Sequence, residues 1–233
     1  MPEQVTRVKV WPGVLRLTHW AAALGLLLLL LSGWLLKSGL VLNDRLYDLL
    51  LEQLHLPAGH LLGVAVAVRL YLLVRDRGVT GYRALIPGRG AWQGIKQGLA
   101  FYATFARARP PRYYAHQPVW APIYLVWWLL LLGQLGSGLL LEFAGLRGLF
   151  GWSSDRLLGA HVAPFGWLAL LTALHVAGVV LDDLKGDGGD VSAMINGHRT
   201  FDTGARGGSG GVAVPPSIAP GDVGRWPPPD RDG

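Results

Sequence analysis

The chain has no cysteine among its 233 residues. This absence excludes disulfides, cysteine-ligated zinc, iron–sulfur clusters and covalently attached c-type haem. Charged residues are also scarce, at 15% of the chain, compared with about 25% in a typical soluble domain. Together with a mean hydropathy of +0.34, this predicts that lipid surrounds much of the chain. Any redox chemistry must then use a non-covalent cofactor that other side chains hold.

The sequence has several apolar runs of about the 20 residues that a membrane-spanning helix needs. Between Arg16 and Lys37, for example, 20 successive residues carry no charge. A cleaved signal peptide is the alternative interpretation of this first run, but no small-x-small cleavage site follows it. The runs predict an all-α fold, an integral membrane four-helix bundle with spans at about 15–36, 57–75, 118–141 and 157–181.

Loop charges predict the orientation of this bundle. Eleven Lys and Arg lie before the first span or in the loop at 75–112, whereas the two alternate loops carry four. The positive-inside rule then predicts that both termini are cytoplasmic in a multi-pass protein of the bacterial cell (inner) membrane. Membrane topology also accounts for the net charge of +6 without nucleic acid as a partner.

Two loop segments are predicted to form short interfacial helices. The segment at 41–56 has leucines at helical spacing and charges opposite, so it is expected on the outer membrane surface, as a lid or as a docking ledge. A weaker stripe of Trp92, Ile95, Leu99 and Tyr102 is expected on the inner side. Residues 1–201 are the predicted membrane domain. The Gly/Pro-rich tail at 202–233 is predicted to be flexible or partner-bound.

Four of the seven histidines lie in or at the ends of spans, where a polar side chain is costly and by default marks function. His161 and His175 are 14 residues apart, nearly four helical turns, so they are expected on one face, about 21 Å apart along one helix. His19 matches the depth of His175, and His60 matches that of His161. Two imidazoles at one depth can supply both axial ligands of a haem iron. The joint pattern predicts two bis-histidine haems b; for one histidine alone, an interhelical hydrogen bond is the alternative.

Glycine and arginine near these histidines extend the candidate site. Glycine lets a flat macrocycle approach the backbone, although it also serves ordinary helix packing in membranes. Arginine at these depths can neutralise a haem propionate or a carboxylate, snorkel to the interface, or mark topology. The candidates are Gly33, Gly63, Gly178, Arg16 and Arg69. The other histidines, His55, His116 and His198, fall outside the spans and are predicted to lie at the surface.

Several motifs resemble those of one family. They are Arg16-Leu17-Thr18-His19-Trp20 and Ser32-Gly33-Trp34, Pro57-Ala58-Gly59-His60 with Arg69, His116-Gln117-Pro118, His161, His175-Val176-Ala177-Gly178, Gly186-Asp187-Gly188 and Met194-Ile195-Asn196-Gly197. Over residues 5–201 the chain resembles the di-haem cytochrome b subunits of membrane-bound nickel–iron hydrogenases. It departs from the family pattern at Gln117, where Asn is usual.

The resemblance implies the same pairs, His19 with His175 and His60 with His161. It implies that hydrogenase small and large subunits pass electrons to the outer haem, which passes them to the inner haem. Membrane quinone is then reduced near the cytoplasmic side, in a pocket formed by His175, His116 and Gln117. The chain would be an electron-transfer subunit rather than an enzyme on its own.

Other functions remain open at this point. The partner could instead be a formate dehydrogenase, a thiosulfate reductase or a c-type cytochrome. A haem-free proton or metal-ion transporter would use the same histidines along a water-filled path, and a passive anchor would not need them. The oligomeric state is also left open.

Overall fold

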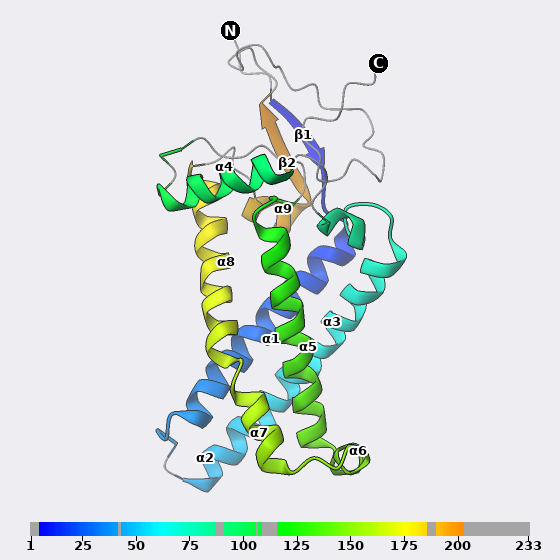
Figure 1. The fold of residues 1–233 in the computed structure, drawn as a ribbon, viewed down its shortest axis with the longest axis vertical. Helices are drawn as coiled ribbons and strands as arrows, with labels where there is room; N and C mark the ends of the chain where they lie inside the picture. Colours follow the sequence, from blue (N-terminus) through cyan, green and yellow to red (C-terminus); the bar gives the residue numbers. More distant parts are fainter. Residues whose placement is uncertain are drawn as a thin grey trace. The chain divides into compact units, whose positions relative to one another are not determined.

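The computed structural model describes residues 5–41, 43–86, 91–105, 107–108, 116–185 and 190–202. The predicted Gly186-Asp187-Gly188 motif and the tail beyond Asp202 lie outside these residues. Four helical segments are long and apolar enough to cross a membrane. They are Gly13–Lys37, Asp44–Arg75, Trp120–Glu142 and Ser154–Leu184 (Figure 1). Each coincides with one predicted span, and the all-α membrane fold is confirmed.

The first of these helices, α1 (Gly13–Lys37), shows how the sequence suits a membrane. Trp20, Leu24, Leu27, Leu31 and Trp34 recur every three or four residues, and each is between 46% and 61% exposed. Such a stripe would be costly in water, at about 25 cal/mol for each Å² of apolar surface. Its exposure is expected of a helix surrounded by lipid.

The structure divides into two compact units. The first is drawn from residues 1–16, 71–124 and 174–233, and the second from residues 17–70 and 125–173. The long helices contribute residues to both units, so each unit is described by itself.

The core of the second unit is built from α1, α3 (Leu56–Arg75) and α5 (Trp120–Glu142). Leu26, Leu62 and Val66 are buried at its centre, and Trp127 and Leu131 pack against them. Gly25 lets α1 and α3 approach closely, since a Cβ there would lie 3.2 Å from the Ala58 carbonyl oxygen.

The segment before α3 is helical, as predicted, but it does not form a separate surface helix. It comprises α2 (Asp44–Asp48) and a π-helical turn, η1 (Leu49–His55), which runs directly into α3 (Figure 1). In the π-helical turn, the Leu56 N–H donates to the Leu51 carbonyl, five residues back. Pro57 explains this widening, because proline has no N–H and its ring crowds the carbonyl four residues earlier.

Proline also interrupts the fourth span. Its two parts are α7 (Ser154–Val162) and α8 (Phe165–Lys185), separated by a turn at Ala163 and Pro164. The prediction of one uninterrupted helix over 157–181 was therefore wrong. A short helix, α6 (Ala144–Leu149), lies between α5 and α7.

The first unit contains two strands that the sequence did not predict. Strand β1 (Val5–Lys9) pairs antiparallel with β2 (His198–Asp202), and Val5 lies opposite Asp202 (Figure 1). Gly197 precedes β2 with φ +87°, a conformation that favours glycine. Its carbonyl accepts hydrogen bonds from the backbone N–H groups of Val10 and Trp11 at 2.8 and 3.1 Å.

Behind this ribbon lies a small core. It joins residues from the amino-terminal segment, the 3-10 turn η2 (Tyr82–Leu85) and α9 (Asp190–Asn196). The buried members are Val10, Trp11, Leu15, Ala84 and Ala193.

The predicted helix at the second loop is present as α4 (Ala91–Ala103), and its stripe divides into exposed and half-buried residues. Trp92 and Leu99 are 65% and 55% exposed, whereas Gly98 and Phe101 are buried. A Cβ on Gly94 would lie 2.9 Å from the Pro118 side chain. The glycines therefore pack together with the half-buried Ile95 and Tyr102 of the stripe, whereas Trp92 and Leu99 are exposed.

Candidate functional site

Two histidines of the second unit face one another. His55, the last residue of η1, and His161, near the end of α7, have ring centroids 6.1 Å apart and ring planes inclined at 77°. Two helical segments that are remote in sequence thus bring two imidazoles to one place.

The Nδ1 atoms of both rings are engaged by neighbouring helices. His55 Nδ1 lies 2.9 Å from Ser32 Oγ on α1. His161 Nδ1 lies 3.0 Å from Ser137 Oγ and 3.1 Å from the Gln134 carbonyl oxygen, both on α5. Among the described residues, neither Nε2 atom has a hydrogen-bond partner.

Glycines follow both serines in the chain and lie against the same two rings. A Cβ added to Gly33 would be 3.6 Å from His55 Cε1. One added to Gly138 would be 3.2 Å from His161 Cε1, closer than most real Cβ contacts. The sequence predicted Gly33 as part of the site but did not identify Gly138, Ser32 or Ser137.

This donor set fits a bis-imidazole metal centre. A first-row metal–imidazole bond is about 2 Å, so two imidazoles on opposite sides of one iron have ring centres about 6 Å apart. The observed 6.1 Å matches this separation, which edge-to-face packing of two rings also gives. A metal-bound histidine normally donates its other N–H to a neighbouring acceptor, and both Nδ1 atoms lie beside one here.

His60, which the sequence paired with His161, is placed differently. Its Nε2 lies 3.1 Å from Glu142 Oε2 at the end of α5, and its side chain is 52% exposed. The structure therefore brings His55, and not His60, to His161. Gly63 lies one turn after His60, and a Cβ there would meet nothing within 4 Å.

The other predicted pair, His19 with His175, is divided between the two units, so the pairing stays a prediction. His19 lies on α1 in the second unit, where its ring packs edge-on against Trp20 with centroids 5.4 Å apart. Arg69 is half-buried on α3 in the same unit.

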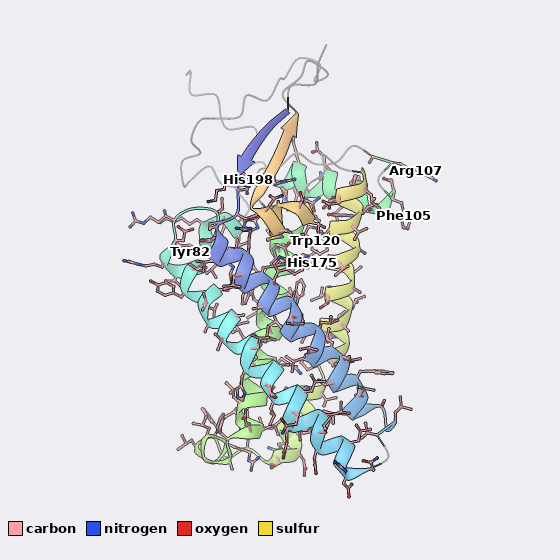
Figure 2. The ribbon with its side chains drawn as sticks, turned by 180° about the vertical axis from the view of Figure 1, so that it is seen from behind. Tyr82, Phe105, Arg107, Trp120, His175 and His198 are labelled. Atoms are coloured by element: carbon pink, nitrogen blue, oxygen red, sulfur yellow. The ribbon has the colours of Figure 1, made fainter. Side chains whose placement is uncertain are left out.

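His175 lies on α8 among aromatic rings of the first unit. Its ring centroid is 5.9 Å from that of Trp120 and 6.3 Å from that of Tyr124, and Figure 2 shows Trp120 and His175 side by side. Gly178, one turn later, leaves room for the Trp120 side chain, since a Cβ at Gly178 would lie 2.5 Å from the indole ring. The glycine predicted to admit a macrocycle thus admits an indole in this structure.

A buried polar cluster lies beside these aromatic residues. Tyr102 Oη is 2.7 Å from both Asp182 Oδ2 and Gln117 Oε1, and it accepts a hydrogen bond from Trp120 Nε1 at 2.9 Å. Gln117 is only 4% exposed. Burial raises the pKa of the Tyr102 hydroxyl far above its usual range, and the hydrogen bond to Asp182 adds to the shift. Tyr102 is therefore a neutral hydroxyl at physiological pH.

In this cluster the Tyr102 hydroxyl is shared between two side chains. The phenol has a single proton for two oxygens at hydrogen-bond distance. Tyr102 donates to Asp182 Oδ2, and the Gln117 side-chain oxygen lies at the same distance from the hydroxyl. The sequence identified Gln117 but not Tyr102 or Asp182 as members of this site.

The structure also shows the contacts of two further predicted site residues, His116 and Arg16. His116 Nε2 is 3.0 Å from the Val79 carbonyl oxygen, and its ring packs on Trp11 with centroids 5.1 Å apart. Arg16 donates through a guanidinium nitrogen to the Ile195 carbonyl, so in this structure it holds the end of α9. Neither contact involves the Tyr102 cluster.

The four membrane helices and the facing histidines define a membrane protein of the cytochrome b class. The chain belongs to the prokaryotic cytochrome b561 family, whose model matches residues 10–197. This family implies b-type haem, and the chain's function is membrane electron transfer. No solved structure matches the chain.

Three curated relatives have the same printed name, "Probable Ni/Fe-hydrogenase B-type cytochrome subunit". The protein from Rhodobacter capsulatus is 26% identical, over 84% of this chain and 82% of its own length. The one from Cupriavidus necator is 25% identical, over 82% and 86%. The one from Rhizobium leguminosarum bv. viciae is 26% identical, over 83% and 89%. They confirm the resemblance to hydrogenase cytochrome b subunits.

Proposed function

We propose that this chain carries electrons from a nickel–iron hydrogenase, on the outer side of a bacterial inner membrane, to membrane quinone. The names of the three relatives support the hydrogenase as partner. The observation that carries the electron-transfer role is the facing pair His55 and His161, with both Nδ1 atoms hydrogen-bonded and ring centres 6.1 Å apart.

In this proposal, His55 and His161 would hold the outer of two b haems, and His19 and His175 would hold the inner one. Bound haem provides one-electron transfer through its iron. The protein's part is to hold neutral imidazoles in place: Ser32 and the Gln134 carbonyl accept from the Nδ1–H groups, which leaves each Nε2 lone pair for metal. His60, bound to Glu142, has no part in this ligand set.

The cluster around Tyr102 supports quinone reduction near His175. Reducing a quinone to a quinol takes two electrons and two protons, so the site needs a proton source inside the protein. Asp182 is a buried carboxyl group that accepts from Tyr102, and Tyr102 in turn contacts Gln117 and Trp120, which packs against His175. We assign Asp182 as the group that takes up a proton from the cytoplasmic side and passes it toward the quinone oxygen.

The first test is haem stoichiometry on the purified chain, with a reduced-minus-oxidised visible spectrum. We expect two non-covalent, low-spin b haems per chain. The second test joins the chain to its hydrogenase in vesicles that contain quinone, where hydrogen should reduce both haems and a quinone pulse should reoxidise them. A chain without haem, after expression with enough haem, excludes electron transfer. Haems that quinone leaves reduced exclude only the quinone site.

A further inference from the structure

The surroundings of His55 and His161 repeat one arrangement on two different helices. Each ring lies against a Ser-Gly pair, Ser32-Gly33 on α1 and Ser137-Gly138 on α5. Each serine hydroxyl also donates to the carbonyl four residues earlier in its own helix, Leu28 at 2.7 Å and Gly133 at 2.8 Å. Ser32 is fully buried.

These hydrogen bonds favour a proton on the Nδ1 atom of each imidazole. A serine hydroxyl has one proton, and in both cases it lies at short range to a helix carbonyl. The serine oxygen can then only accept from the histidine, so Nδ1 is the donor. The Gln134 carbonyl, 3.1 Å from His161 Nδ1, leads to the same conclusion because a carbonyl oxygen cannot donate.

We propose that Ser32 and Ser137 are positioning residues that fix the Nδ1–H tautomer and the ring planes of His55 and His161, and thereby set the reduction potential of the haem bound between them. This inference rests on the proposed haem site. An acceptor on Nδ1–H makes the imidazole a more basic ligand. A more basic ligand favours ferric over ferrous iron, so each serine lowers the potential of this haem.

Removal of the two serine hydroxyls should have unequal effects on the histidines. If Ser137 is removed, His161 keeps the Gln134 carbonyl as an acceptor. If Ser32 is removed, no other acceptor for His55 Nδ1 remains among the described residues. Loss of Ser32 should therefore raise the potential and free the ring plane more than loss of Ser137.

The experiment compares Ser32→Ala, Ser137→Ala and a matched control, Thr172→Ala. The Thr172 hydroxyl makes the same bond to its own helix, to the Leu168 carbonyl at 2.7 Å, and has no histidine partner among the described residues. Potentiometric titration is followed by visible spectra and by EPR of the ferric haems. Imidazole planes near perpendicular give a strongly anisotropic low-spin EPR signal, so this signal reports the ring planes.

We expect Ser32→Ala to raise the ratio of ferrous to ferric outer haem at fixed potential about fivefold, since loss of the acceptor makes His55 a less basic ligand. A tenfold change corresponds to 59 mV for one electron. The low-spin signal of that haem should also shift. Ser137→Ala should change the ratio less, and Thr172→Ala should change neither quantity. The inner haem should keep its potential in all three variants.

Unchanged potential and EPR signal in both serine variants, at normal haem content, would overturn the inference and leave the haem site standing. An equal shift of both haems would overturn it too, because it indicates a general structural effect. If the alanine variants lose the outer haem, the haem content of Ser32→Thr and Ser137→Thr tests the proposal instead. Recovery of haem with the hydroxyl supports positioning, and no recovery overturns it. A wild-type chain without haem would instead refute the proposed function.

Discussion

The imidazole of His55 lies 6.1 Å from that of His161, and the two rings belong to helical segments that are remote in the chain. This relationship predicts which histidine is a haem ligand. His55→Ala should reduce the content from about two haems per chain to about one, because an iron with one imidazole lost has no second axial ligand. His60→Ala should retain both haems, since His60 Nε2 contacts Glu142.

Haem content per chain and the redox spectrum measure this difference directly. The two variants serve as controls for each other, as both remove one imidazole from the same stretch of helix. Full haem content in His55→Ala, with loss in His60→Ala, would restore the pairing that the sequence predicted.

Two prolines explain why the sequence led to His60. Pro57 was taken as the start of the second span, which put His55 outside it. The structure runs a helix through Pro57 by widening one turn, and His55 is the last residue of that turn. The sequence did contain one signal for His55. It lies two residues before Pro57, and a helix can continue through a proline by forming a π-helical turn. Pro164 similarly interrupts the helix between His161 and His175, so the two histidines lie on different helices, α7 and α8.

A second prediction concerns the space beside His161. A Cβ on Gly138 would lie 3.2 Å from His161 Cε1, whereas one on Gly136 would meet nothing within 4 Å. Gly138→Ala should therefore move the ring and weaken binding of the outer haem about tenfold, as changes around a metal ligand commonly do. Gly136→Ala is the matched control on the same helix and should bind haem normally.

Haem loss to apomyoglobin, followed as a rate, measures this weakening. Equal rates in the two glycine variants would show that the ring of His161 tolerates the added methyl group. The close contact at Gly138 would then have no role in haem binding.

The contacts between residues far apart in the chain could not be predicted from the sequence for a different reason. Apolar runs identify helices because lipid acts on each one separately. The bond between Tyr102 and Asp182 joins residues 80 positions apart, and no periodic pattern relates them. The Ser-Gly pairs at Ser32 and Ser137 were visible as repeated dipeptides, but only the packing of helices shows that each meets a histidine.

A third prediction tests the inner pair. His175→Ala should remove the inner haem and leave most of the outer one, because His55 and His161 keep both of their imidazoles. EPR resolves the two haems by their low-spin signals. Selective loss of the outer haem would contradict the pairing of His19 with His175.

The last prediction concerns protons. Asp182→Asn and Tyr102→Phe remove the buried carboxyl and the phenol next to it, which lie 2.7 Å apart. Both variants should keep their haems, and quinone-dependent reoxidation of the reduced haems should slow about 10- to 100-fold, the range in which a positioned acid contributes. Tyr71→Phe is the control, since Tyr71 is an exposed tyrosine of the same unit.

Stopped-flow spectra in light and heavy water measure the rates, and the slow variants should show the larger solvent isotope effect because water must then deliver the proton. Normal reoxidation in both variants would remove Asp182 from the proton path. It would not affect the proposed haem ligation by His55 and His161, so the proton path and the electron path can fail separately.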